Sequence, residues 1–267
     1  MVVILAGIQL YIDLKPIVSG ENALIGNDYV VISKPVKRLN SKAVFSPEEI
    51  QELKEQPFVL RLGEFTPAQY KIMGSIDING MGMSTYMFFE AIPDAFMDVK
   101  SKEWKFKQSK HKVPIVIPRN YLNLYNFGFS QTSEQLPQIT ESMMKDLELE
   151  LTLSGDNHSQ KFVGKVVGFT DRLNTILVPH DFITWSNKRF AKNETPQVSR
   201  LILEVMNPSD PELLSYFKNH GYVAENKPAE SSKALFLLRI SVGVIIFIGL
   251  IFSVLSLIIL CLSIYIY

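Results

Sequence analysis

Histidine, cysteine and carboxylate side chains could hold a metal ion or perform acid–base catalysis, but in this sequence they are scattered. The four histidines are far apart, and none has the spacing of a metal-ligand motif; they are His111, His158, His180 and His220. The single cysteine, Cys261, lies in an apolar tail, so the rest of the chain holds no cysteine-based zinc site and no thiol nucleophile. The pattern predicts no catalytic residues, no metal site and no cofactor.

Two short segments imitate metal-binding motifs. The segment Asp77-Ile-Asn-Gly80 resembles the start of a calcium loop but lacks the later glutamate, so a turn is predicted there. Four methionines follow one another closely, at Met73, Met81, Met83 and Met87. They could bind a soft metal, but flexible apolar packing or an adaptable contact surface is the favoured interpretation. No glycine-rich phosphate loop occurs, so the chain itself is not expected to hydrolyse a nucleotide.

A lysine-rich segment runs from Lys100 to Lys112, with the sequence KSKEWKFKQSKHK. It holds six lysines and one acid, Glu103, with Trp104 and Phe106 among them. Lysines interleaved with aromatic rings can bind single-stranded nucleic acid or anionic headgroups. The favoured alternative is a strand edge that the lysines protect, with the aromatic rings turned inward. The whole chain has 27 basic and 27 acidic residues, and this balance argues against nucleic acid as its partner.

The apolar tail, Ile240 to Tyr267, contains no charged residue in a chain of 267 residues. As a helix rising ~1.5 Å per residue it could extend roughly 42 Å, whereas a bilayer core is about 30 Å thick. A transmembrane helix over residues 234–267 is therefore predicted. Four small residues share one side of it: Gly249, Ser253, Ser256 and Ser263. Small residues let a second helix approach closely, so they form a candidate helix-packing site; the alternative is that lipid merely tolerates them.

Residues 1–12, MVVILAGIQLYI, are also uncharged but too short to span a membrane. They fit the second half of a transmembrane helix, or alternatively an apolar strand or helix packed on the body. They lack the basic start and the small-residue cleavage site of a signal peptide. Lys227, Lys233 and Arg239 precede the tail and no charge follows it, so the positive-inside rule alone weakly favours a cytoplasmic body.

The charged body, residues 13–233, has a strand-helix-strand order near each of its ends. The early unit consists of a strand at 29–33, a helix at 45–56 that opens with a Ser46–Glu49 capping box, and a strand at 58–65. The late unit consists of a strand at 200–206, a helix from Asp210-Pro211 that Gly221 stops, and a strand at 222–223. A further strand is expected at 70–78. Two such units predict a split β-α-β, ferredoxin-like layer.

About a hundred residues, about 92–195, are expected as an insert between the two units. Its predicted elements are a strand at 113–117, a helix from Pro118 to Asn126 closed by Gly128, a hairpin of 147–153 with 161–170, a brief strand at 176–179 and a helix at 180–190. The predicted fold class is α+β. It combines the split layer, an inserted β-rich subdomain, a C-terminal transmembrane helix and a partial N-terminal one.

Three segments of the body carry a family resemblance. They are VPIVIPRNYLNLYNFGF at 113–129, KFVGKVVGFT at 161–170 and ILVPHDFITW at 176–185. Together with the apolar ends they resemble the extracytoplasmic core domain of FtsX/MacB-like ABC transporter permeases, especially those of Bacteroidota. The resemblance implies that residues 13–233 lie outside the cell inner membrane, contrary to the charge rule. It also implies a separate cytoplasmic ATP-binding subunit, whose ATP hydrolysis moves the outer domain to act on lipoproteins, exported molecules or cell-wall hydrolases.

Members of that family have a full first helix, this domain and three further helices. Here the first helix is half present and the chain ends in the second, so the resemblance predicts a fragment or a truncated paralogue. Such a chain would sit in the lipid bilayer and pair with a full-length permease or a second copy. The leading hypothesis is a membrane-anchored, non-catalytic permease domain. The alternative is a tail-anchored membrane protein with a cytoplasmic binding domain; a membrane-bound hydrolase, the third class, lacks a catalytic constellation.

Overall fold

The computed structural model describes residues 29–36, 43–78, 80–132, 137–192, 197–208 and 210–225, with 244, 247–252, 254–255, 258 and 265 in the tail. The partial transmembrane helix expected at 1–12 lies outside the described residues, as does most of the helix expected at 234–267. Within the described part of the chain, no helix is both long enough and apolar enough to cross a membrane.

The chain divides into two compact units. One comprises Met1–Val31, Pro57–Leu60 and Glu204–Tyr267, and the other comprises Ile32–Gln56 and Arg61–Leu203. The described residues form two sheets with accompanying helices. The mixed α+β class predicted from the sequence is therefore confirmed.

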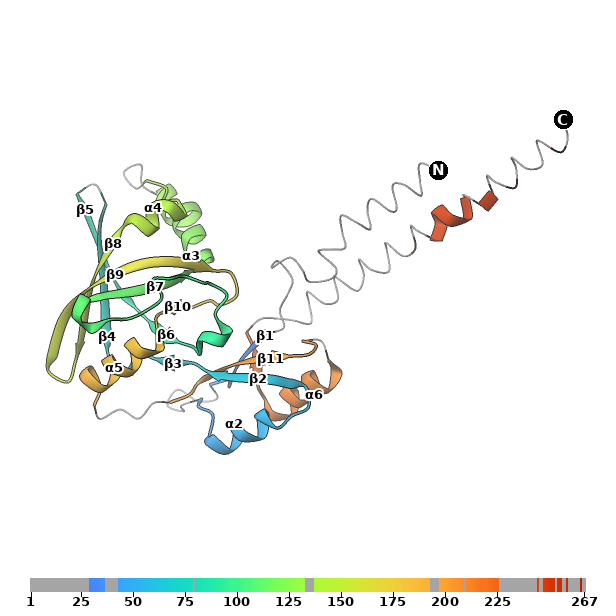
Figure 1. Cartoon of the computed structure of the whole chain (residues 1–267), viewed down its shortest axis with the longest axis horizontal. Helices are drawn as coiled ribbons and strands as arrows, with labels where there is room; N and C mark the ends of the chain where they lie inside the picture. The colour runs from blue at the N-terminus through green and yellow to red at the C-terminus, as the bar shows by residue number, and fades with distance from the viewer. Residues whose placement is uncertain are drawn as a thin grey trace. The chain divides into compact units, whose positions relative to one another are not determined.

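One sheet has four strands in the order β12-β1-β11-β2 (Figure 1). Its strands are β1 (Tyr29–Ser33), β2 (Val59–Glu64), β11 (Arg200–Val205) and β12 (Val223–Ala224). Helix α2 (Pro47–Lys54) follows β1 in the chain, and helix α6 (Pro211–His220) follows β11. The two strand-helix-strand units recognised in the sequence thus supply the strands of one sheet, although more than a hundred residues separate them.

The ends of α2 and α6 carry the capping residues that the sequence predicts. The Ser46 hydroxyl accepts the Glu49 N–H at 3.3 Å, and the Glu49 carboxylate accepts the Ser46 N–H at 2.8 Å. At α6, the Asp210 carboxylate accepts the Glu212 N–H at 2.8 Å. The helix ends at Gly221 with φ of 68°, a left-handed conformation that glycine adopts because it has no Cβ atom.

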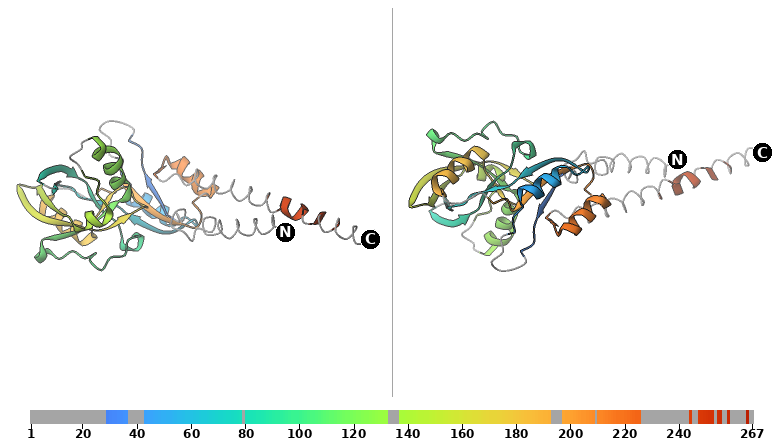
Figure 2. Two further views of the ribbon diagram at one scale, coloured as in Figure 1. Left: turned by 90° about the horizontal axis from the view of Figure 1, so that it is seen from above. Right: turned by 90° about the horizontal axis from the view of Figure 1, so that it is seen from below.

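The other sheet has eight strands in the order β3-β6-β10-β7-β9-β8-β4-β5. Its strands are β3 (Thr66–Pro67), β4 (Lys71–Ile78), β5 (Met81–Met87), β6 (Phe89–Ala91), β7 (Lys112–Pro118), β8 (Glu148–Gly155), β9 (His158–Thr170) and β10 (Ile176–Leu177). The sheet therefore includes strands from residues 66–91 that precede the insert expected at about 92–195. Figure 2 shows β8 and β9 as its longest hairpin, which the alternating sequence of β8 predicts.

The two faces of this sheet differ in polarity. On β8, Leu149, Leu151 and Leu153 are buried, whereas Glu148 and Glu150 between them are exposed. Alternate residues of a strand point to opposite faces, so one face holds the core and the other is wet. Helices α3 (Arg119–Leu124), α4 (Glu141–Asp146) and α5 (His180–Phe190) accompany the sheet, with short helical turns η1 (Asp94–Phe96), η2 (Gln108–Lys110), η3 (Tyr125–Phe129) and η4 (Ser130–Thr132).

Helix α3 continues further than predicted. It passes directly into η3, a π-helical turn that includes Gly128, so this glycine does not end the helix. The Asn126 side chain holds the turn, because its amide accepts the Ile139 N–H and donates to the Ile139 carbonyl, both at 2.8 Å. A contact with a residue 13 positions later thus overrides the local stop signal.

Helix α5 is held by an aromatic cluster centred on Phe182, which is fully buried. Four ring centroids lie between 5.0 and 6.5 Å from that of Phe182: those of Phe89, Phe106, Phe162 and Trp185. Such pairs add to the free energy of burial through edge-to-face and tilted contacts. The cluster connects β6, the lysine-rich segment, β9 and α5.

Replacing Phe182 by alanine should lower the free energy of unfolding by roughly 3–5 kcal/mol, because a fully buried ring is lost and a cavity remains. Phe88→Ala is the matched control, since Phe88 is 82% exposed and its loss should cost less than about 0.5 kcal/mol. Urea unfolding of the detergent-solubilised chain, followed by circular dichroism, measures both. Equal destabilisation by the two substitutions would contradict the assigned core.

Candidate functional site

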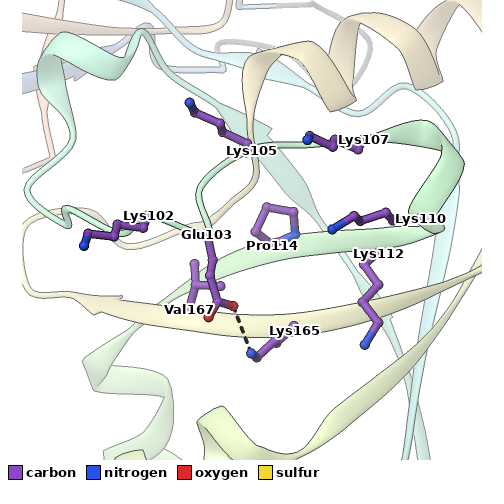
Figure 3. Close-up of a pocket in the computed structure, with 9 residues that line it drawn as sticks. All are labelled: Lys102, Glu103, Lys105, Lys107, Lys110, Lys112, Pro114, Lys165 and Val167. Atoms are coloured by element: carbon purple, nitrogen blue, oxygen red, sulfur yellow. Dashed lines mark ion pairs between the residues drawn. The ribbon is translucent and has the colours of Figure 1, made fainter.

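A lysine-lined hollow of about 410 Å³ opens beside β7 and β9 (Figure 3). Six lysines contribute to its wall: Lys102, Lys105, Lys107, Lys110, Lys112 and Lys165. Glu103 is the one acidic residue of the lining, so at neutral pH the lining carries a formal charge of +5. The apolar pocket beside β4 and β5 differs from it, because its lining contains no charged residue.

Two features of the fold bring these lysines together. The lysine-rich segment turns back on itself through η2, and a backbone bridge joins Lys107 to Lys112 at the start of β7. Strand β7 then pairs in parallel with β9, and this register sets Pro114 opposite Lys165. Lys165 is thus added to the hollow from a strand more than fifty residues further along the chain, and nothing in the local sequence indicates it.

Side-chain contacts hold the segment in place. The Phe106 ring packs against the core, with its centroid 5.0 Å from that of Phe182. The Trp104 indole N–H donates to the Asp94 carboxylate at 3.2 Å. His111 takes a left-handed conformation with φ of 50° at the turn into β7. The expectation that aromatic rings of this segment turn inward is confirmed for Phe106.

The segment does not protect an outer edge of the sheet. It lies beside the first residues of β7, and β7 stands between β10 and β9 in the strand order. The terminal strands are β3 and β5, to which the segment makes no backbone pairing in the described structure. The segment instead lies along the start of an interior strand, which β10 pairs only at Val116. This strand order could not be read from the segment itself.

Two of the six lysines are paired with carboxylates. Lys165 lies 2.9 Å from Glu103, and the two side chains point toward each other in Figure 3. Their hydrogen bond, reinforced by their opposite charges, lowers the pKa of Glu103 and raises the pKa of Lys165. Lys112 lies 2.8 Å from Glu148, and this hydrogen bond likewise lowers the pKa of Glu148. The lowered pKa values keep the Glu103 and Glu148 carboxylates ionised at neutral pH.

The other four lysines have no such partner. Among the residues that the structure describes, no ion pair involves Lys102, Lys105, Lys107 or Lys110. The nearby acids on the wet face of the sheet are already engaged, Glu148 by Lys112 and Glu150 by Lys161. The hollow consequently concentrates uncompensated positive charge in a chain whose total charge is zero.

An apolar pocket of about 360 Å³ forms the second concave surface, lined by residues of β4, β5, α3, α4 and neighbouring strands. Met83 and Met87, two of the four methionines, line it. Met73 is 37% exposed and lies outside it. Apolar packing, the role predicted for the methionines, thus describes Met83 and Met87.

The four histidines lie on different elements of the structure. His220 stacks on Tyr216 with centroids 4.0 Å apart, and the His111 ring lies 5.4 Å from that of Phe162. His158 begins β9 after a tight turn, and His180 begins α5. In the described part of the chain, no three histidine, cysteine, aspartate or glutamate residues gather as a metal site.

The calcium-loop fragment is a hairpin turn between β4 and β5, as predicted. The Asp77 carboxylate accepts the Gly80 N–H at 2.9 Å, and Gly80 has φ of 83°. This side chain therefore closes a turn within its own hairpin.

The candidate helix-packing residues are described only in part. Gly249 lies within the helical residues 247–252 and is buried, whereas Phe247, Ile248 and Leu250 around it are exposed. Ser253, Ser256 and Ser263 lie outside the described residues.

Comparison with known families now identifies the class of protein. The model of the family described as "Probable transporter periplasmic core domain" matches residues 30–227, about three quarters of the chain. The chain belongs to this family, and the resemblance to FtsX/MacB-like permease domains seen in the sequence is confirmed. A comparison with curated proteins finds no match.

Three solved structures are similar to this chain, each at low sequence identity. The periplasmic region of MacB from Actinobacillus actinomycetemcomitans is 11% identical, with a TM-score of 0.39, covering 80% of this chain and 94% of that one. The extracellular domain of the noncanonic ABC-type transporter YknZ from Gram-positive bacteria is 17% identical, with a TM-score of 0.34. The match covers 74% of this chain and 100% of that one. A domain assigned to a permease protein of Porphyromonas gingivalis is 13% identical, with a TM-score of 0.33. The match covers 73% of this chain and 84% of that one.

Proposed function

We propose that this chain is the extracytoplasmic core domain of an FtsX/MacB-like ABC transporter permease, held at the cell inner membrane. The observation that carries the proposal is the match of residues 30–227 to the family of transporter periplasmic core domains. In this function the chain has no catalytic residues of its own. A separate cytoplasmic ATP-binding subunit hydrolyses ATP, and the domain converts the resulting movement into export or envelope remodelling.

The proposed arrangement along the chain has three parts. Residues 1–12 belong to a membrane helix, 13–233 form the extracytoplasmic ferredoxin-like layer with its inserted subdomain, and 234–267 form the second membrane helix. Exposure of the tail supports this. Its ten described large hydrophobic side chains, between Val244 and Tyr265, are 45–90% exposed. A bilayer would remove that apolar surface from water, which is favourable.

The arrangement of the first and last strands suits mechanical coupling. β1, the first described strand, and β12, the last, are neighbours in the four-stranded sheet. The Glu225 N–H beyond β12 donates to the Val31 carbonyl of β1 at 2.8 Å. Both membrane segments would therefore join the domain at adjacent strands, so a relative movement of the two segments would act directly on one pair of strands.

The proposed partners are the lipid bilayer, the ATP-binding subunit, and either a full-length permease or a second copy of this chain. The side of the tail that carries Gly249, Ser253, Ser256 and Ser263 would contact the partner's helix, because small residues permit close backbone approach. Nucleic acid is not among the proposed partners, since the chain as a whole carries no net charge.

An alkaline phosphatase fused after Lys227 should be active in intact cells, because this enzyme acquires its activity only outside the cytoplasm. A green fluorescent protein fused at the same residue is the control and should be dark if exported by the general secretory route. The reverse result, a fluorescent fusion with inactive phosphatase, would instead support the tail-anchored protein with a cytoplasmic binding domain, which the charge rule favours.

Substituting Gly249 by leucine should reduce crosslinking of the tail to its partner helix several-fold, since the larger side chain separates the two backbones. Val254→Leu is the matched control, because residue 254 lies about 140° around the helix from residue 249 and should leave crosslinking unchanged. Crosslinking in native membranes, quantified by mass spectrometry, gives the comparison. Unchanged crosslinking with Gly249→Leu would refute the packing face.

A further inference from the structure

The lysine-lined hollow contains more positive charge than the fold requires. Four of its lysines have no ion pair among the described residues, although paired lysines occur on the same sheet. Like charges gathered in one place repel one another, so clustering them disfavours the folded state unless an anion compensates. Edge protection accounts for the lysines only at the start of β7, which β10 leaves unpaired and which Lys107 bridges at Lys112.

The hollow is also pre-formed. Its lysine-rich wall is held by the buried contact of Phe106 with Phe182, by the bridge from Lys107 to Lys112, and by the ion pair of Glu103 with Lys165. A binding surface whose backbone is already ordered loses less conformational entropy when a ligand arrives. The volume of about 410 Å³ lies within the usual range of small-molecule sites.

We propose that this hollow binds a multivalent anion that carries phosphate groups. Lysine binds phosphate as a mobile point charge, and several lysines can follow charges spread over more than one phosphate. The lining has no aromatic face on which nucleic acid bases would stack. It also has no arginine fork, so bidentate recognition of one carboxylate or one phosphate is not expected, and spread negative charge suits it better. The phosphate can belong to a soluble compound or to a lipid headgroup. Anion binding in this hollow is independent of the proposed function, in which a separate subunit hydrolyses ATP.

Lys107 and Lys110 are the lysines to change, because both side chains extend toward the side on which Pro114 lies (Figure 3). Lys107→Gln/Lys110→Gln should weaken the binding of inorganic tripolyphosphate about tenfold. The control, Lys54→Gln/Lys188→Gln, removes the same charge from two exposed lysines outside the hollow and should change affinity less than about twofold. Isothermal titration calorimetry on the full chain in an uncharged detergent measures each affinity.

A second variant separates charge from shape. Lys107→Arg/Lys110→Arg keeps both charges and should bind tripolyphosphate within about twofold of the unchanged chain. Raising the salt from about 0.1 M to about 1 M should weaken binding, because the Debye length falls from about 10 Å to about 3 Å. The proposal is overturned if the unchanged chain shows no saturable binding, if both glutamine variants weaken it equally, or if the arginine variant loses as much as the glutamine variant.

Reconstitution identifies the source of the phosphate. The full chain is placed in nanodiscs of phosphatidylcholine, with or without phosphatidylglycerol, and tripolyphosphate binding is compared with that of Lys107→Gln/Lys110→Gln. Weakening by phosphatidylglycerol in the unchanged chain alone supports a lipid headgroup as the occupant. Equal binding in both kinds of nanodisc supports a soluble phosphate compound.

Discussion

Burial of Phe182 among four other aromatic rings is the interaction that joins helix α5 and the lysine-rich segment to strands β6 and β9 of the eight-stranded sheet. One of those rings, Phe106, belongs to the lysine-rich segment, so the same hydrophobic contact that fixes helix α5 also fixes the wall of the hollow. A charged loop gains no order from its own mutually repelling lysines. Here apolar packing supplies the order, and the lysines are held together as a consequence.

Strand pairing then decides which charges meet. The parallel register of β7 and β9 places Lys165 beside the lysine-rich segment, and the antiparallel register of β8 and β9 sets Glu148 opposite Lys165. Acids and lysines on the wet face form ion pairs, while the segment's remaining lysines line the hollow. In the other sheet, adjacency of β1 and β12 brings the two ends of the domain together. The order of the strands therefore decides both which charged side chains meet and which strands lie next to each other at the two ends of the domain.

Much of this could be predicted from local signals. The Ser46 capping box, the β8–β9 hairpin and helix α5 all appear where sequence patterns indicated, because caps, turns and alternation act over a few residues. The patterns did not reveal β5, since its methionines and small polar residues resemble a loop, nor that β4 pairs with β8. Likewise Lys165 could not be assigned to the hollow, because only long-range pairing brings it there. Gly128 failed as a stop signal for the same reason.

The body of this transporter-family domain is proposed to lie outside the inner membrane. The most direct measurement uses a chain with Cys261→Ser and Lys188→Cys, which leaves one thiol, on the exposed surface of α5. Intact cells are treated with a membrane-impermeant maleimide and compared with lysed cells. If the body lies outside the membrane, labelling should be equal in both. Labelling that appears only after lysis would place the body in the cytoplasm and contradict it.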